Sequence, residues 1–145
     1  MKSPAELTQL FRARGLKVTP QRQAIFRILH GAALSGSGTH PTAESVYAAA
    51  SAAMPTISLR TVYQTLNDLA AMGEVHQLDL GTGSSRFDPN LDAHHHLVCE
   101  VCGTVVDVYA DTSAVKVAPK QRHGFAIAAT EVLFRGTCPD CRSTN

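Results

Sequence analysis

Two pairs of cysteines have the spacing of metal ligands. Cys99 and Cys102 form one Cys-x-x-Cys pair, Cys138 and Cys141 form another, and 35 residues separate the pairs. Each pair can direct two sulfurs at one ion from a tight turn, and four thiolates around a tetrahedron make a closed structural zinc site. A redox dithiol and ordinary buried cysteines are the alternatives, but two such pairs favour zinc. A site closed by four cysteines has no open position for a signal molecule.

A run of three histidines, His94 to His96, stands just before the first cysteine pair. Side chains alternate along a strand, so His94 and His96 share one face and His95 points to the other. The run therefore offers two ligands together, and His95 is left unassigned. Further candidate ligands are His40, Asp88 and Asp107.

Imidazoles combined with carboxylates suit Fe(II), Mn(II) or Zn(II) better than soft metals. Taken alone, a histidine such as His40 beside a proline is more often a surface residue or a helix cap than a metal ligand, and Asp107 is a weak signal. If all five residues bound one ion, the ion would connect the front of the chain to its back and set their relative orientation.

Helix signals fill the first half of the chain. Polar caps predict helix starts at Ser3 (with a capping box to Glu6), at Thr19 and after His40-Pro41-Thr42, and Ser58 caps LRTVYQTLNDLAAM. The helices are predicted to end at Gly15, at Met54-Pro55 and at Gly73. The stretch GAALSGSG, residues 31–38, is typical of a flexible connector. The alternating stretch EVHQLDLGTGSSRFD then predicts a β-hairpin. Helices followed by a two-stranded ribbon are typical of a winged helix-turn-helix.

The pattern changes after Pro89. HLVCEVCGTVVDVY and FAIAATEVLFRGTC are strand-like, and a helix limited by Pro119 is expected between them. We predict an α+β fold with three parts: a winged-helix DNA-binding domain over 1–86, a hinge over 87–92, and an α/β dimerisation and metal-binding domain over 93–145.

Composition narrows the class of protein. No apolar run approaches the roughly 18 residues of a membrane span, and the start MKSPAELTQLF does not resemble a signal peptide. A cytoplasmic location without membrane association is therefore expected. Residues 1–86 carry 8 Lys+Arg against 5 Asp+Glu, whereas residues 87–145 carry 5 against 7. This imbalance is small, but it agrees with an anion-binding front half and a cation-binding back half.

The helix after Ser58 has the composition of a DNA-recognition helix. Its positions off the apolar stripe include Arg60, Thr61, Tyr63 and Gln64. Arg60 stands in the first turn, where the helix dipole disfavours a cation, so a phosphate or guanine partner would explain it. Further candidate DNA contacts are Gln21 and Arg22 at the preceding helix start, and Arg86 on the wing. A solvated helix face is the alternative for each of these residues.

With HPTAESVY, ISLRTVYQTLNDLAAMGEV, SSRFD, HHHLVCEVCG and GTCPDC in this order, residues 15–141 resemble the ferric-uptake-regulator superfamily. Within it, the sequence is most similar to the peroxide-responsive repressors. Asp88 follows SSRF where iron-sensing members typically have Glu, His94 and His96 flank one residue, and Asp107 follows CGTVVD in register.

The resemblance implies a homodimeric repressor that binds a double-stranded DNA operator and is not an enzyme. It implies structural zinc on the four cysteines and a regulatory iron(II) or manganese(II) on His40, Asp88, His94, His96 and Asp107. In such proteins peroxide reacts at the ferrous ion, a ligand histidine is oxidised (His40 or His94 by match), and DNA is released.

Two alternatives remain at this point. One is an iron- or zinc-uptake regulator of the same superfamily. The other is a metallo-hydrolase or deaminase-like enzyme, because histidine with Cys-x-x-Cys can form a catalytic zinc site. The deaminase signature, however, places Glu two residues after the histidine and Pro before the Cys-x-x-Cys. Here Val98 occupies both positions.

Overall fold

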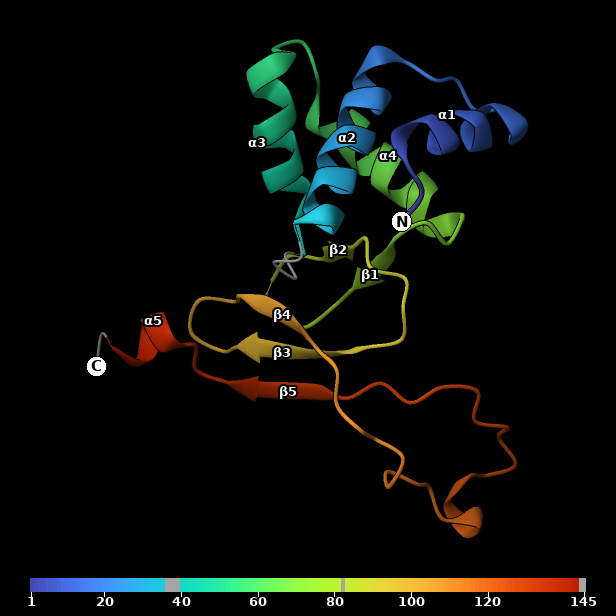
Figure 1. Cartoon of the computed structure of the whole chain (residues 1–145), viewed down its shortest axis with the longest axis vertical. Coiled ribbons are helices and arrows are strands. Elements are labelled where there is room, and N and C mark those ends of the chain that lie inside the picture. Colours follow the sequence, from blue (N-terminus) through green and yellow to red (C-terminus); the bar gives the residue numbers. More distant parts are fainter. Residues whose placement is uncertain (36–39, 82, 144–145) are drawn as a thin grey trace. The chain divides into compact units, whose positions relative to one another are not determined.

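The protein is described by a computed structural model that covers residues 1–35, 40–81 and 83–143. The chain divides into two compact units, Met1–Asp92 and Ala93–Asn145 (Figure 1). The first unit contains four α-helices and a two-stranded sheet, and the second contains a three-stranded sheet. This is the predicted α+β fold.

The helices of the first unit begin at their polar caps. They are α1 (Pro4–Ala13), α2 (Pro20–Leu34), α3 (Ala43–Ala53) and α4 (Leu59–Ala71). The side chains of Ser3, Thr19, Thr42 and Ser58 each accept a hydrogen bond from the backbone N–H three residues later. Helix α2 continues to Leu34, so the predicted connector over 31–38 starts too early, and residues 36–38 lie outside the described part of the chain.

The apolar stripes of these helices meet in one core. Phe11 of α1 and Phe26 of α2 pack edge to face, with ring centroids 4.8 Å apart. Val62, Leu66 and Leu69 of α4 are fully buried in the same cluster. Burial of an apolar side chain contributes about 1.5–3 kcal/mol, so this core fixes α4 with its polar face outward.

A small antiparallel ribbon completes the first unit. Strand β1 (His76–Leu78) pairs with β2 (Arg86–Asp88), with His76 opposite Asp88. Phe87 is 1% exposed and belongs to the helical core. The first two residues of the predicted hinge therefore lie inside the body of this unit. Four helices followed by a ribbon form the predicted winged helix-turn-helix.

The second unit is built on a mixed sheet. Its strands are β3 (His95–Cys99), β4 (Val105–Val108) and β5 (Leu133–Gly136), in the order β4-β3-β5. Strand β3 is central, antiparallel to β4 and parallel to β5. A short helix, α5 (Pro139–Arg142), carries the last cysteine pair.

The prediction of a helix between β4 and β5 is wrong. The segment over 109–132 contains only the 3-10 turn η1 (Pro119–Gln121). Ala118 has φ −58° and ψ 142°, because the ring of a following proline disfavours helical backbone. After the turn, His123 and Gly124 have φ of 46° and 81°, which prevents the helix from continuing. The strand expected over 125–138 is likewise reduced to β5.

Within the described residues, no helix is both long enough and apolar enough to cross a membrane.

Candidate functional site

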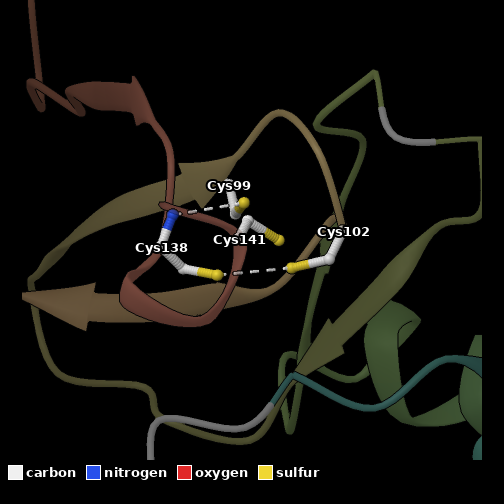
Figure 2. A group of neighbouring side chains, drawn as sticks. All are labelled: Cys99, Cys102, Cys138 and Cys141. Atoms are coloured by element: carbon white, nitrogen blue, oxygen red, sulfur yellow. Dashed lines mark hydrogen bonds between the residues drawn. The ribbon is translucent and has the colours of Figure 1, made fainter. Parts of the chain in front are cut away.

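The four cysteines converge in the second unit. Figure 2 shows Cys99 and Cys102, from the end of β3 and the turn after it, facing Cys138 and Cys141 from the α5 segment. The four Sγ atoms lie within 4.8 Å of one another, and those of Cys102 and Cys138 are 3.7 Å apart. Zinc–sulfur bonds of about 2.3 Å in a tetrahedron require sulfurs roughly 3.8 Å apart. The residues therefore fit a zinc ion.

The turn that carries the first pair is closed by the backbone. The N–H of Cys99 donates to the carbonyl of Thr104 at 2.8 Å, and the N–H of Gly103 donates to the carbonyl of Cys99 at 2.9 Å. Gly103 has φ 71°, a left-handed conformation that favours glycine. The conformation of this short turn thus places the sulfurs of Cys99 and Cys102 on the same side of the turn.

The protonation of the thiols also fits a cation. Hydrogen bonds from the backbone N–H groups of Cys102 and Cys138 lower the pKa of the Cys99 thiol to about 6. The sulfur of Cys138, followed by burial, raises the pKa of Cys141 to about 12. Four adjacent thiolates repel one another, so the last proton is held tightly until a positive ion replaces it.

The predicted imidazole and carboxylate ligands of the second unit also come together. The Nε2 atoms of His94 and His96 are 3.0 Å apart, and Nε2 of His94 is 3.5 Å from Oδ1 of Asp107. The antiparallel register explains the placement, because His96 on β3 is opposite Asp107 on β4. These three side chains offer nitrogen and oxygen donors without sulfur.

The first unit holds the other two predicted ligands as a pair. Nε2 of His40 lies 3.6 Å from Oδ2 of Asp88. The segment before α3 runs beside β2. Thr42 forms an isolated antiparallel β-bridge with Arg86, and the N–H of Phe87 donates to the carbonyl of Pro41 at 2.9 Å. This pairing brings together two residues that are 48 positions apart in sequence.

His95 has a structural contact on the other face of β3. Its Nδ1 accepts a hydrogen bond from the N–H of Val132 at 3.3 Å. This contact helps join the segment before β5 to β3. A residue that sequence reasoning missed lies next to it: Oε1 of Glu131 is 3.1 Å from Nδ1 of His96.

Five of the seven predicted DNA contacts line one groove of the first unit. The groove has a volume of about 490 Å³, and its lining includes Gln21, Arg22, Arg60, Thr61 and Gln64. It also includes Lys17, which the sequence reading missed because no helix pattern covers it. Residues from the first turns of α2 and α4 line this space, and three of the lining side chains, Lys17, Arg22 and Arg60, are cations.

At least four of the predicted DNA contacts already have partners within the unit. Gln64 donates to Asp68 at 3.0 Å, Arg86 donates to the carbonyl of His40 at 3.1 Å, and Arg22 and Tyr63 are also bonded. The guanidinium of Arg22 binds Asp68 of α4 at 2.7 Å and lies over the ring of Phe11, 5.1 Å from its centroid. The hydroxyl of Tyr63 donates to Oε1 of Glu44 at 2.6 Å, which lowers the pKa of that carboxyl. Arg22 thus fixes α2 against α4, and this role competes with a DNA contact.

A winged helix joined to a unit with a four-thiolate centre and imidazole–carboxylate donors is the organisation of a metal-dependent transcription regulator. The profile of the Ferric uptake regulator family matches residues 13–135. The chain belongs to this family, whose members are transcription regulators and not enzymes, so the deaminase alternative is set aside.

Known relatives include a peroxide-responsive repressor. The Peroxide-responsive repressor PerR of Staphylococcus aureus (strain Mu50 / ATCC 700699) is 37% identical over 132 residues, which are 90% of this chain and 86% of that protein. The solved ferric uptake regulator of Helicobacter pylori is 21% identical with a TM-score of 0.75, over 98% of this chain and 97% of that one. Streptococcus pyogenes PerR, solved as a peroxide sensor, is 26% identical with a TM-score of 0.53, over 97% and 94%.

Proposed function

We propose that this chain is a cytoplasmic, homodimeric repressor that senses peroxide through a regulatory iron(II) or manganese(II). The five proposed ligands are His40, Asp88, His94, His96 and Asp107. While the ion is bound, the two units are held in the arrangement that binds a double-stranded operator. Oxidation of a ligand histidine releases the ion and the DNA.

One observation carries this proposal. Each unit presents an imidazole–carboxylate pair, His40 with Asp88 at 3.6 Å and His94 with Asp107 at 3.5 Å. Asp88 and His94 are only six positions apart, and six extended residues span at most about 20 Å. The short connection keeps the two half-sites within reach of one shared ion.

The donor set suits the proposed chemistry. Five nitrogen and oxygen ligands leave one octahedral position for a small molecule. Ferrous iron bound there would supply one electron to cleave the O–O bond of peroxide next to an imidazole, and the ring, which loses two electrons overall, would return it. Overall, one peroxide oxygen adds to the ring of His40 or His94 and the other leaves as water. The chain's own contribution would be to hold that ring as a ligand beside the bound ion.

The four cysteines would hold a structural zinc. Because sulfur would fill all four positions of a tetrahedral ion, this site would leave no place for peroxide or for a further ligand. Its role is to tie the turn after β3 to α5. The sensing chemistry is therefore assigned to the nitrogen and oxygen ligands alone.

DNA recognition is assigned to the groove at the starts of α2 and α4. Arg60 is exposed in the first turn of α4, with Lys17 and Gln21 across the groove. One unit offers few phosphate contacts, so a second copy is needed for a full operator. The sheet of the second unit suits that pairing, because Val106, Leu97 and Phe134 form an apolar row across its three strands.

Fe(II)-loaded protein treated with dilute peroxide provides the test. An operator is first selected from random duplexes with Mn(II)-loaded protein, and binding is followed by fluorescence anisotropy. We expect peroxide to release the Fe(II) form and to add one oxygen atom to a peptide that contains His40 or His94. The peptide of His76, an exposed histidine of β1, should stay unmodified, and the Mn(II) form should remain bound to DNA.

The alternative is an iron- or zinc-uptake regulator, for which the ion itself is the signal. That protein would release DNA on metal depletion but would keep both its DNA and its unmodified histidines in peroxide. Retained DNA binding with no oxygen adduct would therefore reject peroxide sensing and leave the family assignment intact.

A further inference from the structure

We infer that Glu131 is a positioning residue for His96, and that its carboxylate directs the Nε2 atom of that imidazole to the regulatory metal. The inference rests on the proposed metal site. The observation behind it is the 3.1 Å distance between Oε1 of Glu131 and Nδ1 of His96. The other ring nitrogen of His96 faces His94, with 3.0 Å between the two Nε2 atoms.

The sheet places Glu131 on the correct side of β3. His96 pairs with Leu133 of β5 in the parallel register, and the N–H of His96 donates to the carbonyl of Val132 at 3.2 Å. Glu131 stands two residues before Leu133, so in extended chain it shares that residue's face. Asp107 of β4 and Glu131, in the segment just before β5, thus flank His96.

The chemistry of the contact selects one tautomer. A neutral imidazole has one N–H donor and one acceptor nitrogen, whereas a carboxylate only accepts. With Glu131 at Nδ1, the ring proton resides on Nδ1. The lone pair of Nε2 is then free to bind a metal and points toward the other proposed metal ligands. A carboxylate in this position also restricts the rotation of the imidazole.

The size of the effect follows from exposure. Loss of such a supporting carboxylate usually weakens metal binding about 10–100-fold. The side chain of Glu131 is 62% exposed, so water competes for the hydrogen bond and weakens it. We therefore expect a loss near the lower limit, about tenfold.

Full-length, zinc-loaded protein would be tested as four variants. Glu131→Ala removes the acceptor, and Glu131→Gln keeps an oxygen acceptor without the charge. Glu100→Gln makes the same charge change at an exposed glutamate that follows the far end of β3, and serves as the matched control. His96→Ala tests whether His96 binds the metal at all.

Two measurements are made on each variant. Mn(II) affinity is obtained from the electron paramagnetic resonance signal of free Mn(II). The tautomer of His96 is obtained from its ring 15N chemical shifts in protein without regulatory metal, above neutral pH. The second measurement does not depend on metal binding, so it also separates this inference from the proposed function.

We expect Glu131→Ala to bind Mn(II) about tenfold more weakly and to lose the Nδ1–H tautomer. Glu131→Gln should lose less affinity and keep the tautomer, and Glu100→Gln should match the unsubstituted protein. Unchanged affinity with an unchanged tautomer in Glu131→Ala overturns the inference. A loss in Glu131→Gln as large as that in His96→Ala also overturns it, because Glu131 would then be a direct ligand. Full Mn(II) affinity in His96→Ala rejects the proposed ligand set instead, and the tautomer still decides the role of Glu131.

Discussion

Replacing Cys138 by serine should unfold the second unit while leaving the first unit folded. The sulfur of Cys138 lies 3.7 Å from the sulfur of Cys102, and the backbone N–H of Cys138 donates to the sulfur of Cys99 at 3.4 Å. The substitution removes one of four ligands, and serine is not among the usual ligands of structural zinc. We therefore expect loss of zinc, of the second unit's structure and of the dimer together.

The magnitude follows from how little else holds this unit. Among its described residues, the buried apolar side chains are Val98, Cys99 and Val105. At about 1.5–3 kcal/mol for each buried valine, the two valines contribute on the order of 5 kcal/mol. Structural zinc sites in small domains contribute about 10–16 kcal/mol at neutral pH. Zinc binding is therefore expected to stabilise this unit more than the burial of its apolar side chains does.

Two measurements check this expectation: calorimetry for unfolding, and native mass spectrometry for the bound zinc. The Cys138→Ser protein should keep one cooperative transition, from the first unit, and amide exchange over 93–143 should become fast. Ser143→Ala, in the same C-terminal segment, is the control and should keep its zinc. A stable, zinc-free Cys138→Ser dimer with protected amides in β3 would refute the reasoning.

Three further predictions concern the first unit. Ser3→Ala should lower the free energy of unfolding by about 1 kcal/mol in urea denaturation. The Ser3 hydroxyl, followed by the Ser3 N–H, donates to the Glu6 carboxylate and holds its pKa below the usual 4.5. The part of the difference that comes from the hydroxyl's bond to the carboxylate should therefore be complete above pH 4.5 and lost as pH falls through the lowered pKa; a difference that does not depend on pH would contradict this. Arg22→Ala and Asp68→Ala in a double-mutant cycle should show a coupling of about 0.5–1 kcal/mol, and strict additivity would exclude the ion pair as a stabilising contact. Lys17→Ala should weaken all DNA binding alike and reduce the slope of log K against log salt by about 1, whereas an unchanged slope would place Lys17 away from phosphate.

The helices of the first unit could be predicted because their signals are local. A cap such as Ser3 or Thr19 bonds a backbone N–H only three residues away, so the residues that decide the helix start stand together in the sequence. The same holds for the turn of the Cys99 pair. The helix expected before β5 failed for a local reason as well, since Pro119 and the extended Ala118 outweigh the apolar spacing around them.

The partners of the site residues could not be predicted in the same way. Lys17 precedes α2 without any periodic pattern, and only the packing of α2 against α4 shows that it borders a groove with Arg60. Glu131 is 35 residues from His96, and nothing in the spacing indicates that they meet. A shift of β5 by one residue would point Glu131 to the opposite face of the sheet.

The sequence by itself determined which chemistry is present: paired cysteines for a closed thiolate centre, and alternating histidines with carboxylates for a nitrogen–oxygen centre. These properties depend on residue type and on spacing within a few positions. Only the tertiary structure decided which distant groups serve them. Strand pairing sets His40 beside Asp88 and places Asp107 and Glu131 on either side of His96. Such contacts depend on register, which the hydrogen bonds of the whole sheet select.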